Sequence, residues 1–516
     1  MKFKKVLFIS GILFFLIKNP FFIFAQENNA VLVQQENSIQ EQQENQITFN
    51  IENDAENLSG QNQTQNQKNW SEKKHPVAAL TGALGFNVLL STWNRYMIGS
   101  EWAKTGPEEW CRFWERELEW DTDWYWTNFF LHPYQGAQYY MASRSANMNR
   151  IEAFGITTLG ALMWEYLCEK NLPSKNDVVY TTVASFCVGE MFYRLSLEAS
   201  SYSKLLGIAF NPQRLYSEYV WQIKQNPTTG NIHALSIGNE IGNVVGNIKT
   251  HTKGTLAFNN TEIYPFMMQF FLNTDYNDPY THDSNVPYSQ FSMNVKAGLG
   301  AGSGVSGPCT SEDVDSKIGY EIRIFSDAML WARSLQLSEN TESSFGITMI
   351  YDFDWHSYYM VSSIATGLAF KQRVNFPSSK LEWQAQTAYI ILGNTEYVYW
   401  HRKIDFVPES SFRTYSYTIG AEGILKAKYT TSKNHVLDFN MRSWAMYDFY
   451  NQKQLLADTG WEFLTLFSLA YEIPVSKEVS IGIMDEVLAK MAVYKELPSV
   501  QKIANSARIY AKLQLK

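Results

Sequence analysis

The strongest constraint on the fold of this chain is a change in hydrophobic period near residue 230. Beyond that point apolar and polar residues alternate, most clearly in 291–300, 318–324 and 415–422. A period of two is typical of a β-strand with one apolar and one polar face. The same alternation recurs in 381–386, 437–442, 479–483 and 509–516. With weaker candidates this half holds about 13 strands, and an even number of about 12 or 14 is the natural closed antiparallel solution.

The predicted strands have the length expected of membrane-crossing strands. They run to about ten residues, against about five or six in a soluble sheet, and so could cross a bilayer at a tilt. Aromatic residues cluster at strand ends in 351–359 and 397–400, as interfacial girdles require. We therefore expect residues 211–516 to form an antiparallel β-barrel of about 12–14 strands, of outer-membrane type. The alternative is a soluble β-sandwich or lipocalin-like barrel, and the final Lys516 departs from the aromatic residue that typically ends an outer-membrane barrel.

The N-terminus predicts export from the cytoplasm. Lys2, Lys4 and Lys5 precede an apolar run at 6–17, and Ala25 offers a cleavage point, so residues 1–25 are typical of a signal peptide. An uncleaved anchor is the alternative, although the run is short for a membrane span. Residues 26–70 are rich in Gln and Asn and poor in apolar residues, which predicts a disordered linker.

Composition excludes several classes of protein. The formal charge of −8 argues against a nucleic-acid partner, and the 15% aromatic content argues against overall disorder. The four cysteines are scattered and the eight histidines show no ligand spacing, so we expect no metal site and no cofactor. The sequence has neither a P-loop nor a GxSxG motif, and the glycine-rich stretch at 298–307 precedes no predicted helix.

Residues 71–210 carry helical patterns, so the predicted fold class is α+β, with a helical region before the barrel. From Pro76 to Asn94 there is no charged residue, which fits either a transmembrane helix or a buried helix that packs through its glycines. The stretch 101–126 is rich in tryptophan, which fits a membrane interface, a pocket lining or ordinary packing.

Ionisable side chains interrupt the apolar faces of these predicted helices. They are Arg144, Glu165, Glu169, Glu190 and Arg194. Such groups are costly on apolar faces unless they pair or line a polar cavity, so we expect one shared buried network with a mainly structural role. Within it, Glu190 and Arg194 have the i,i+4 spacing of an ion pair.

Two further segments predict helix starts. His132 precedes Pro133, a residue that suits the first turn of a helix. Ser174 and Asp177 have the spacing of a capping box, with Asp in place of the usual Glu. A helix start is the favoured interpretation of the second pair, and a catalytic pair is the alternative.

The motifs in this region resemble a known family. The runs HPYQGAQYYMASR, LMWEYLCE and LPSKNDVVYTTVASFCVGEMFYR are similar to the bacterial family catalogued as domain of unknown function 3943. Its members are secreted envelope proteins of Gram-negative bacteria, so the resemblance implies a location but no activity. The family's shared positions would fall on His132, Tyr134, Gly136, Tyr140, Arg144, Glu165, Glu169, Ser174, Asp177, Glu190 and Arg194.

Together these patterns favour an outer-membrane protein with a structural or transport-related envelope role, in contact with membrane lipid. The periplasm is the alternative location. The helices could plug the barrel, pack below it or sit in the membrane. An inner-membrane protein spanned by helices at 76–94, 151–168 and 178–197 is disfavoured by Glu165 and Glu190.

The rival hypothesis is an envelope enzyme acting on a lipid or a phosphate-bearing substrate. In that hypothesis His132 is the acid–base and Glu165 or Asp177 orients it. Arg144 and Arg194 would hold an anion. The sequence defines neither the ligand nor a protein partner.

Overall fold

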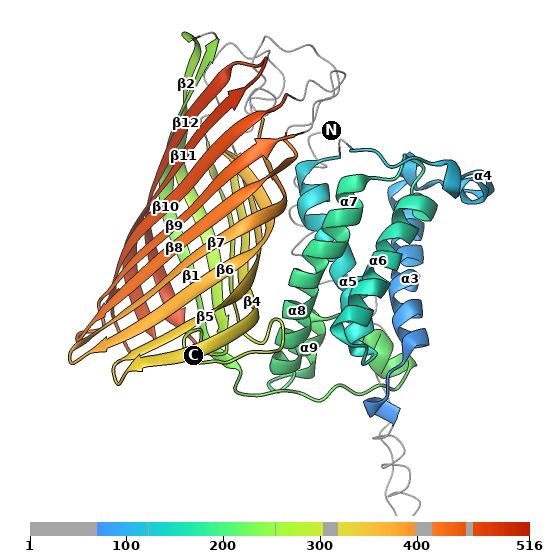
Figure 1. The fold of residues 1–516 in the computed structure, drawn as a ribbon, viewed down its shortest axis with the longest axis horizontal. Helices are drawn as coiled ribbons and strands as arrows, with labels where there is room; N and C mark the ends of the chain where they lie inside the picture. Colours follow the sequence, from blue (N-terminus) through green and yellow to red (C-terminus); the bar gives the residue numbers. More distant parts are fainter. Residues whose placement is uncertain (1–69, 122, 253, 303–317, 398–414, 450–457) are drawn as a thin grey trace, which may run out of the picture.

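The computed structural model describes residues 70–121, 123–252, 254–302, 318–397, 415–449 and 458–516. In it a helical bundle and a closed barrel lie side by side (Figure 1). The predicted signal peptide, nearly all of the predicted linker, and Cys309 fall outside the described residues.

Twelve strands of the described chain form one closed antiparallel barrel, in which the first strand pairs with the last. This confirms the predicted fold class, and the strand number lies within the expected range. The strands are β1 (Ile232–Thr252), β2 (Thr255–Tyr276), β3 (Phe291–Ala301), β4 (Ile318–Ser338), β5 (Thr341–His356), β6 (Met360–Phe376), β7 (Ser379–Thr395), β8 (Thr418–Thr431), β9 (Val436–Asp448), β10 (Gly460–Pro474), β11 (Val479–Tyr494) and β12 (Ser499–Gln514).

Successive side chains on each strand face opposite sides of the barrel wall. On β12, Ile503 and Ile509 are exposed on the outside, whereas Lys502 and Arg508 are buried inside. Exposed apolar side chains recur on the other strands, among them Ile241, Met268, Leu299, Ile347, Leu368, Leu425, Phe463 and Ile483. An apolar exterior around a polar interior is the pattern of a barrel that faces lipid. A soluble barrel would have the opposite pattern.

The two ends of the barrel differ in their connections. Three long connections, 302–317, 396–417 and 449–459, lie at one end, which we call the long-loop end. The other end has the connection 277–290 and otherwise turns at 339–340, 377–378, 432–435 and 475–478. We call it the short-turn end. In outer-membrane barrels the short turns face the periplasm.

The helical bundle consists of four antiparallel runs. The first is α3 (Pro76–Thr92) with η1 (Trp93–Ile98), and the second is η4 (Thr127–Leu131) with α5 (His132–Ser145). The third is α6 (Arg150–Met163) with η5 (Trp164–Cys168), and the fourth joins α7 (Lys175–Val179), η6 (Tyr180–Ala184) and α8 (Ser185–Ala199). Short elements complete the region: η2 (Glu101–Ala103), α4 (Pro107–Cys111), η3 (Phe113–Glu115), α9 (Lys204–Phe210), α10 (Gln213–Leu215) and η7 (Tyr216–Val220).

Small residues let the helices of the bundle approach closely. A Cβ on Gly136 of α5 would lie 2.0 Å from the carbonyl oxygen of Thr181 and 2.1 Å from Oγ of Ser185. These distances are far below van der Waals contact, so only glycine fits where α5 crosses the fourth run. This gives a packing reason for a glycine at that position of the motif.

The bundle packs against the outer wall of the barrel. Asp352 and Asp354 of β5 are buried in the lumen, so the alternate residues Tyr351 and Phe353 face outward, where they join the core that contains Phe129. Tyr351 Oη donates to the carbonyl oxygen of Phe129 at 2.7 Å. The helices therefore do not plug the lumen, and they lie beside the wall of the barrel (Figure 1).

Candidate functional site

The bundle holds one basic cluster at the short-turn end. We call it the arginine cluster: Arg144 of α5, Arg150 of α6, and Arg194 with Glu190 of α8. The Nε atoms of the three arginines lie 2.9, 3.0 and 3.0 Å from the carboxylate of Glu190. The predicted pair between Glu190 and Arg194 is therefore confirmed. Arg194 also connects the cluster to the barrel, because its Nη2 donates to the carbonyl oxygen of Pro287 in the 277–290 connection.

Burial and packing make this cluster rigid. Glu190 is fully buried, and Tyr140 Oη donates to its Oε2 at 3.0 Å. Arg144 also donates to the carbonyl oxygen of Met148 at 2.6 Å, and its guanidinium lies 4.7 Å from the ring centroid of Tyr193. A buried carboxylate with this many donors stays ionised, because charge-assisted hydrogen bonds replace its lost hydration.

Sequence reasoning missed Arg150. It begins α6 directly after the N-cap Asn149, whose side chain accepts from the backbone N–H of Glu152 at 3.0 Å. A charged residue at a helix start is usually solvated, so the pattern gave no reason to single it out. The short connection between α5 and α6 was the available signal, because it brings Arg150 close to Arg144.

A second polar cluster lies at the long-loop end. We call it the carboxyl cluster: Asp121, Asp177 and His132, with Asn128 and Asn176. Asp121 Oδ1 accepts from Asn128 at 2.6 Å and from Asn176 at 3.1 Å, and Asn176 also donates to Asp177 at 2.9 Å. His132 Nε2 lies 3.7 Å from Asp177 Oδ2, and its buried Nδ1 has no hydrogen-bond partner in the described part of the chain.

The pKa values of Asp121, in this cluster, and of Glu169, near it, are shifted in opposite directions. Burial would raise the pKa of Asp121, but hydrogen bonds from Asp177 and Asn128 outweigh it, so the pKa is lowered. Burial and the charge of Asp121 raise the pKa of Asp177, so Asp177 is the donor in the hydrogen bond between the two carboxyl groups. Just beyond η5, burial and the charge of Asp123 raise the pKa of Glu169 to about 8.

The predicted acids Glu165, in η5, and Glu169, just after it, have local partners. Glu165 Oε2 accepts from the backbone N–H of Ser174 at 2.7 Å, and Glu169 Oε1 accepts from Trp164 Nε1 at 2.6 Å. Ser174 is the N-cap of α7 and accepts from the backbone N–H of Asp177 at 3.2 Å, as the predicted helix start requires.

The expectation of one shared network is therefore wrong. Arg144 lies twelve residues after His132 on α5, which separates them by about 18 Å along the helix axis. His132 and Glu165 lie at the long-loop end, whereas Arg144 pairs with Glu190 at the other end. A single catalytic site made of His132, Arg144 and Glu165 is not what the fold assembles.

The barrel lumen is filled by paired charges. Arg442 of β9 contacts Asp352 and Asp354 of β5, and Arg323 of β4 contacts Asp354 and Glu486 of β11. All five side chains are at most 6% exposed. Further pairs join Arg508 to Glu240 and Glu321, Lys490 to Glu462, and Lys371 to Asp327.

Inward-folded segments add to this filling. The turn after β5 places Tyr358 and Tyr359 inside the barrel, where both are buried and Tyr359 Oη accepts from Arg323 at 2.7 Å. After β7, Glu396 also turns inward and lies 3.0 Å from Lys502 Nζ. The lumen is therefore occupied by the protein's own side chains at the level of these residues.

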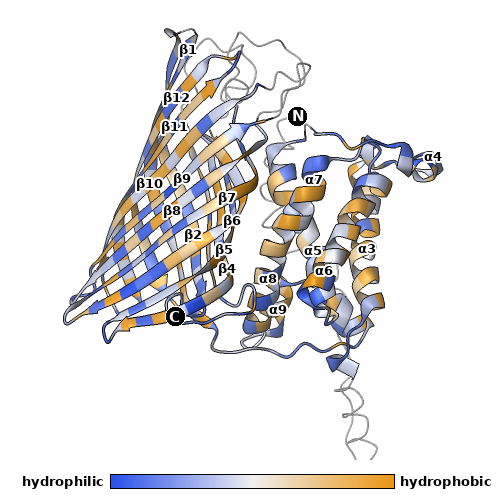
Figure 2. Cartoon of the chain, viewed as in Figure 1, coloured by the Kyte–Doolittle hydropathy of each residue, from blue (hydrophilic) through white to orange (hydrophobic). Residues whose placement is uncertain are grey.

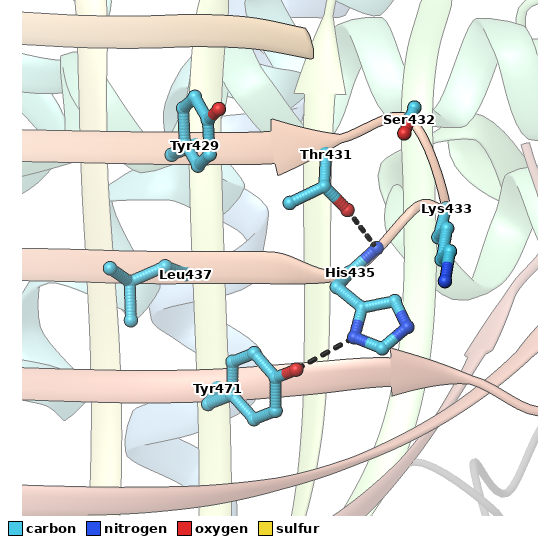
Figure 3. A pocket seen from close by; sticks show the side chains of 7 residues that line it. All are labelled: Tyr429, Thr431, Ser432, Lys433, His435, Leu437 and Tyr471. Carbon is cyan, nitrogen blue, oxygen red and sulfur yellow. Dashed lines mark hydrogen bonds between the residues drawn. The ribbon is translucent and has the colours of Figure 1, made fainter. Parts of the chain in front are cut away.

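One hollow lies on the outer surface, at the β8–β9 turn. Its volume is about 400 Å³, and Figure 3 shows Tyr429, Leu437 and Tyr471 along its floor with Lys433 at its edge. His435 Nδ1 and Tyr471 Oη are 2.6 Å apart. None of the predicted site residues lines it, and its aromatic residues fit an interfacial girdle.

The described residues contain no group of three or more His, Cys, Asp or Glu side chains arranged to hold a metal ion. Cys168 and Cys187 are buried free thiols, and Cys111 is an exposed one.

These features define an outer-membrane-type barrel with a helical bundle fixed to its outer wall. Residues 117–211 match the family model described as Domain of unknown function (DUF3943), the family that the sequence motifs resemble. The match covers η4 to α9, and so includes both polar clusters. No curated protein matches the chain.

Several solved outer-membrane proteins match part of the chain in structure. They include the outer membrane protease OmpT from Escherichia coli, with 7% identity and a TM-score of 0.24 over 56% of this chain and 99% of that one. A FadL homologue from Pseudomonas aeruginosa has 8% identity and a TM-score of 0.21, over 55% of this chain and 90% of that one. An outer membrane channel from Pseudomonas putida F1 has 9% identity and a TM-score of 0.28, over 54% and 96%.

Proposed function

We propose that this chain is a structural protein of the outer membrane, in which a sealed barrel holds a helical bundle within the lipid beside it. The observation that supports this proposal is the exposed apolar surface on the outer face of the bundle, which α3 and α6 form. Between residues 76 and 94 and between 153 and 163 the two helices hold no charged residue. Their exposed apolar side chains include Val77, Val88, Leu89, Phe154 and Leu159.

This face continues the apolar exterior of the barrel, as Figure 2 shows for the hydrophobic lengths of α3 and α6. Among the described residues one helix, Pro76–Ile98, is long and apolar enough to cross a membrane, and 28% of its most apolar stretch is buried. Its 23 residues span about 35 Å, close to the hydrocarbon thickness of a bilayer. An exposed apolar face of this extent would be unstable in water.

The two ends of the bundle have the side chains expected at a membrane surface. Trp93, Tyr96, Trp110 and Trp114 are exposed at the long-loop end. At the short-turn end, before α3, Lys74 forms an exposed pair with Glu152. Aromatic and charged residues at opposite ends of an apolar span are typical of the two interfaces.

A structural role is favoured over transport because the lumen is filled. Buried ion pairs join β5 to β9 and β4 to β11, and removing either partner of such a pair leaves an unpaired charge. Opening a path would therefore require several of these pairs to break together.

The second candidate is an enzyme centred on the carboxyl cluster. The observation that favours it is the unpartnered Nδ1 of His132 beside a proton-sharing pair of carboxyl groups. His132 is only 4% exposed, so substrate would need the adjoining loops to move. Loss of a measured activity in His132→Ala, with retained activity in Arg144→Gln, would support this candidate.

The structural proposal is tested on membranes from cells that express the full chain. We expect the protein at outer-membrane density, with a gel mobility that changes on boiling. Purified protein in planar bilayers should show no steady conductance. A soluble protein without a mobility change would contradict the membrane location, and a stable open channel would contradict the structural role.

A further inference from the structure

We propose that the arginine cluster binds the phosphate of an anionic phospholipid headgroup at the short-turn end of the bundle. This inference rests on the proposed function, because it takes the outer face of the bundle to be in contact with lipid.

The arginine cluster carries unbalanced positive charge. Three guanidinium groups surround one carboxylate, which leaves an excess of two positive charges in the cluster. Two acids close in sequence to the cluster have other partners: Glu152 pairs with Lys74 at 2.7 Å, and the buried Glu198 accepts hydrogen bonds from the neutral side chains of Thr228 and Asn231. An anion is therefore the ligand that this environment favours.

The cluster also has unused hydrogen-bonding capacity. A guanidinium carries five N–H donors in a fixed fork that matches phosphate oxygens. Arg150 uses only Nε, toward Glu190, and no acceptor among the described residues contacts its two Nη atoms. Its side chain is 27% exposed, whereas those of Arg144 and Arg194 are 15% and 14% exposed. Arg144, Arg194 and Glu190 are therefore largely buried, and the guanidinium of Arg150 is the group in the cluster most accessible to a ligand.

An apolar surface lies next to the guanidinium of Arg150. On α6, Arg150 is followed by Ile151, which is 85% exposed, and by Phe154 and Leu159 on the same uncharged face. A lipid whose acyl chains lie along this face would place its phosphate beside Arg150. A free phosphate ion makes no use of the apolar surface, so the observations favour a lipid.

The preference for an anionic headgroup follows from the charge excess. All phospholipids carry a phosphate, but a zwitterionic headgroup brings its own cation to the site. Phosphatidylglycerol or cardiolipin would reduce the positive charge of the cluster without adding a cation. We therefore expect selectivity for these lipids over phosphatidylcholine.

The experiment measures lipid retained by the purified full chain after exchange through nanodiscs of defined composition. Wild-type protein should retain phosphatidylglycerol over phosphatidylcholine, and Arg150→Gln should reduce that selectivity by about tenfold, the expected effect of losing one strong charge-assisted contact. Lys204→Gln is the matched control, since it removes an exposed lysine at the same end that pairs with a different glutamate, Glu218. It should leave selectivity unchanged.

Three results would overturn the headgroup site. They are equal retention of both lipids by the wild type, unchanged selectivity in Arg150→Gln, and an equal loss in Lys204→Gln. A parallel titration with inorganic phosphate separates the sources of the anion, because displacement of the lipid by low millimolar phosphate would show that the site takes the free ion. A spin label at Leu159 tests the proposed function separately: an aqueous label contradicts the lipid-embedded bundle, whether or not the cluster binds phosphate.

Discussion

Arg442 on β9 donates through Nη1 to both carboxylate oxygens of Asp352 on β5, at 2.6 Å each. Three strands separate β5 from β9 in the barrel, so this contact crosses the lumen. Arg442 Nη2 also reaches Asp354 at 2.8 Å, and both side chains of the crossing pair are at most 3% exposed. Ion pairs that cross the lumen therefore connect opposite walls of the barrel. Because these side chains occupy the lumen, the closed barrel does not imply an open pore.

The first prediction concerns this brace. Arg442→Met should lower the free energy of unfolding by about 3 kcal/mol, because it leaves Asp352 buried without its main partner. Arg442→Met with Asp352→Asn should recover part of the loss. Urea unfolding of the protein folded in lipid vesicles measures both. Equal losses in the single and double variants would show that the pair is not coupled.

The second prediction concerns helix packing. Gly136→Val should destabilise the bundle by about 1–3 kcal/mol or more, because any side chain there meets the backbone of the fourth helical run. Gly155→Val is the matched control on α6, where a Cβ meets nothing within 4 Å. Thermal unfolding followed by circular dichroism distinguishes them. Similar melting temperatures for the two variants would contradict the close crossing.

The third prediction concerns pH. The folded-state pKa of Glu169 is raised to about 8, so between its unfolded value and 8 the folded chain binds more protons than the unfolded chain. Stability should therefore fall as pH rises through this window, and it should be higher at pH 5.5 than at pH 8.5. Glu169→Gln should reduce this difference. An unchanged pH profile in the variant would assign the dependence to other groups.

The fourth prediction concerns orientation. Cys111 is exposed on the tryptophan-rich segment at the long-loop end, whereas Cys168 and Cys187 are buried. In a Cys309→Ser background, a membrane-impermeant maleimide should label Cys111 on intact cells. Labelling that requires permeabilised cells would place the long-loop end in the periplasm and reverse the orientation.

The barrel could be predicted because its signal is local. The alternation beginning at Phe291 is β3, and the run from Ile318 begins β4, each as the period of two indicates. The placement of the bundle could not be predicted in this way. Tyr351 and Phe353 face outward like lipid-facing residues, and nothing in their chemistry distinguishes a helix neighbour from an acyl chain.

The polar clusters were predictable only where partners are close in sequence. Glu190 and Arg194 are one helical turn apart, so their pairing follows from spacing. Arg150 joins them through the tertiary packing of α6 against α5 and α8, and sequence spacing does not encode that contact. Asp121 approaches Asp177 for the same reason, across a long separation in the chain.

The most direct test of the account is the environment of the outer face of the bundle. Spin labels at Val88 and Leu159, on α3 and α6, are compared with a label at the exposed Glu108 of α4, using oxygen and an aqueous nickel chelate as relaxants in lipid vesicles. The account predicts high oxygen and low nickel accessibility at Val88 and Leu159, and the reverse at Glu108. Nickel accessibility at Val88 and Leu159 equal to that at Glu108 would show that the bundle lies in water, and would contradict the account.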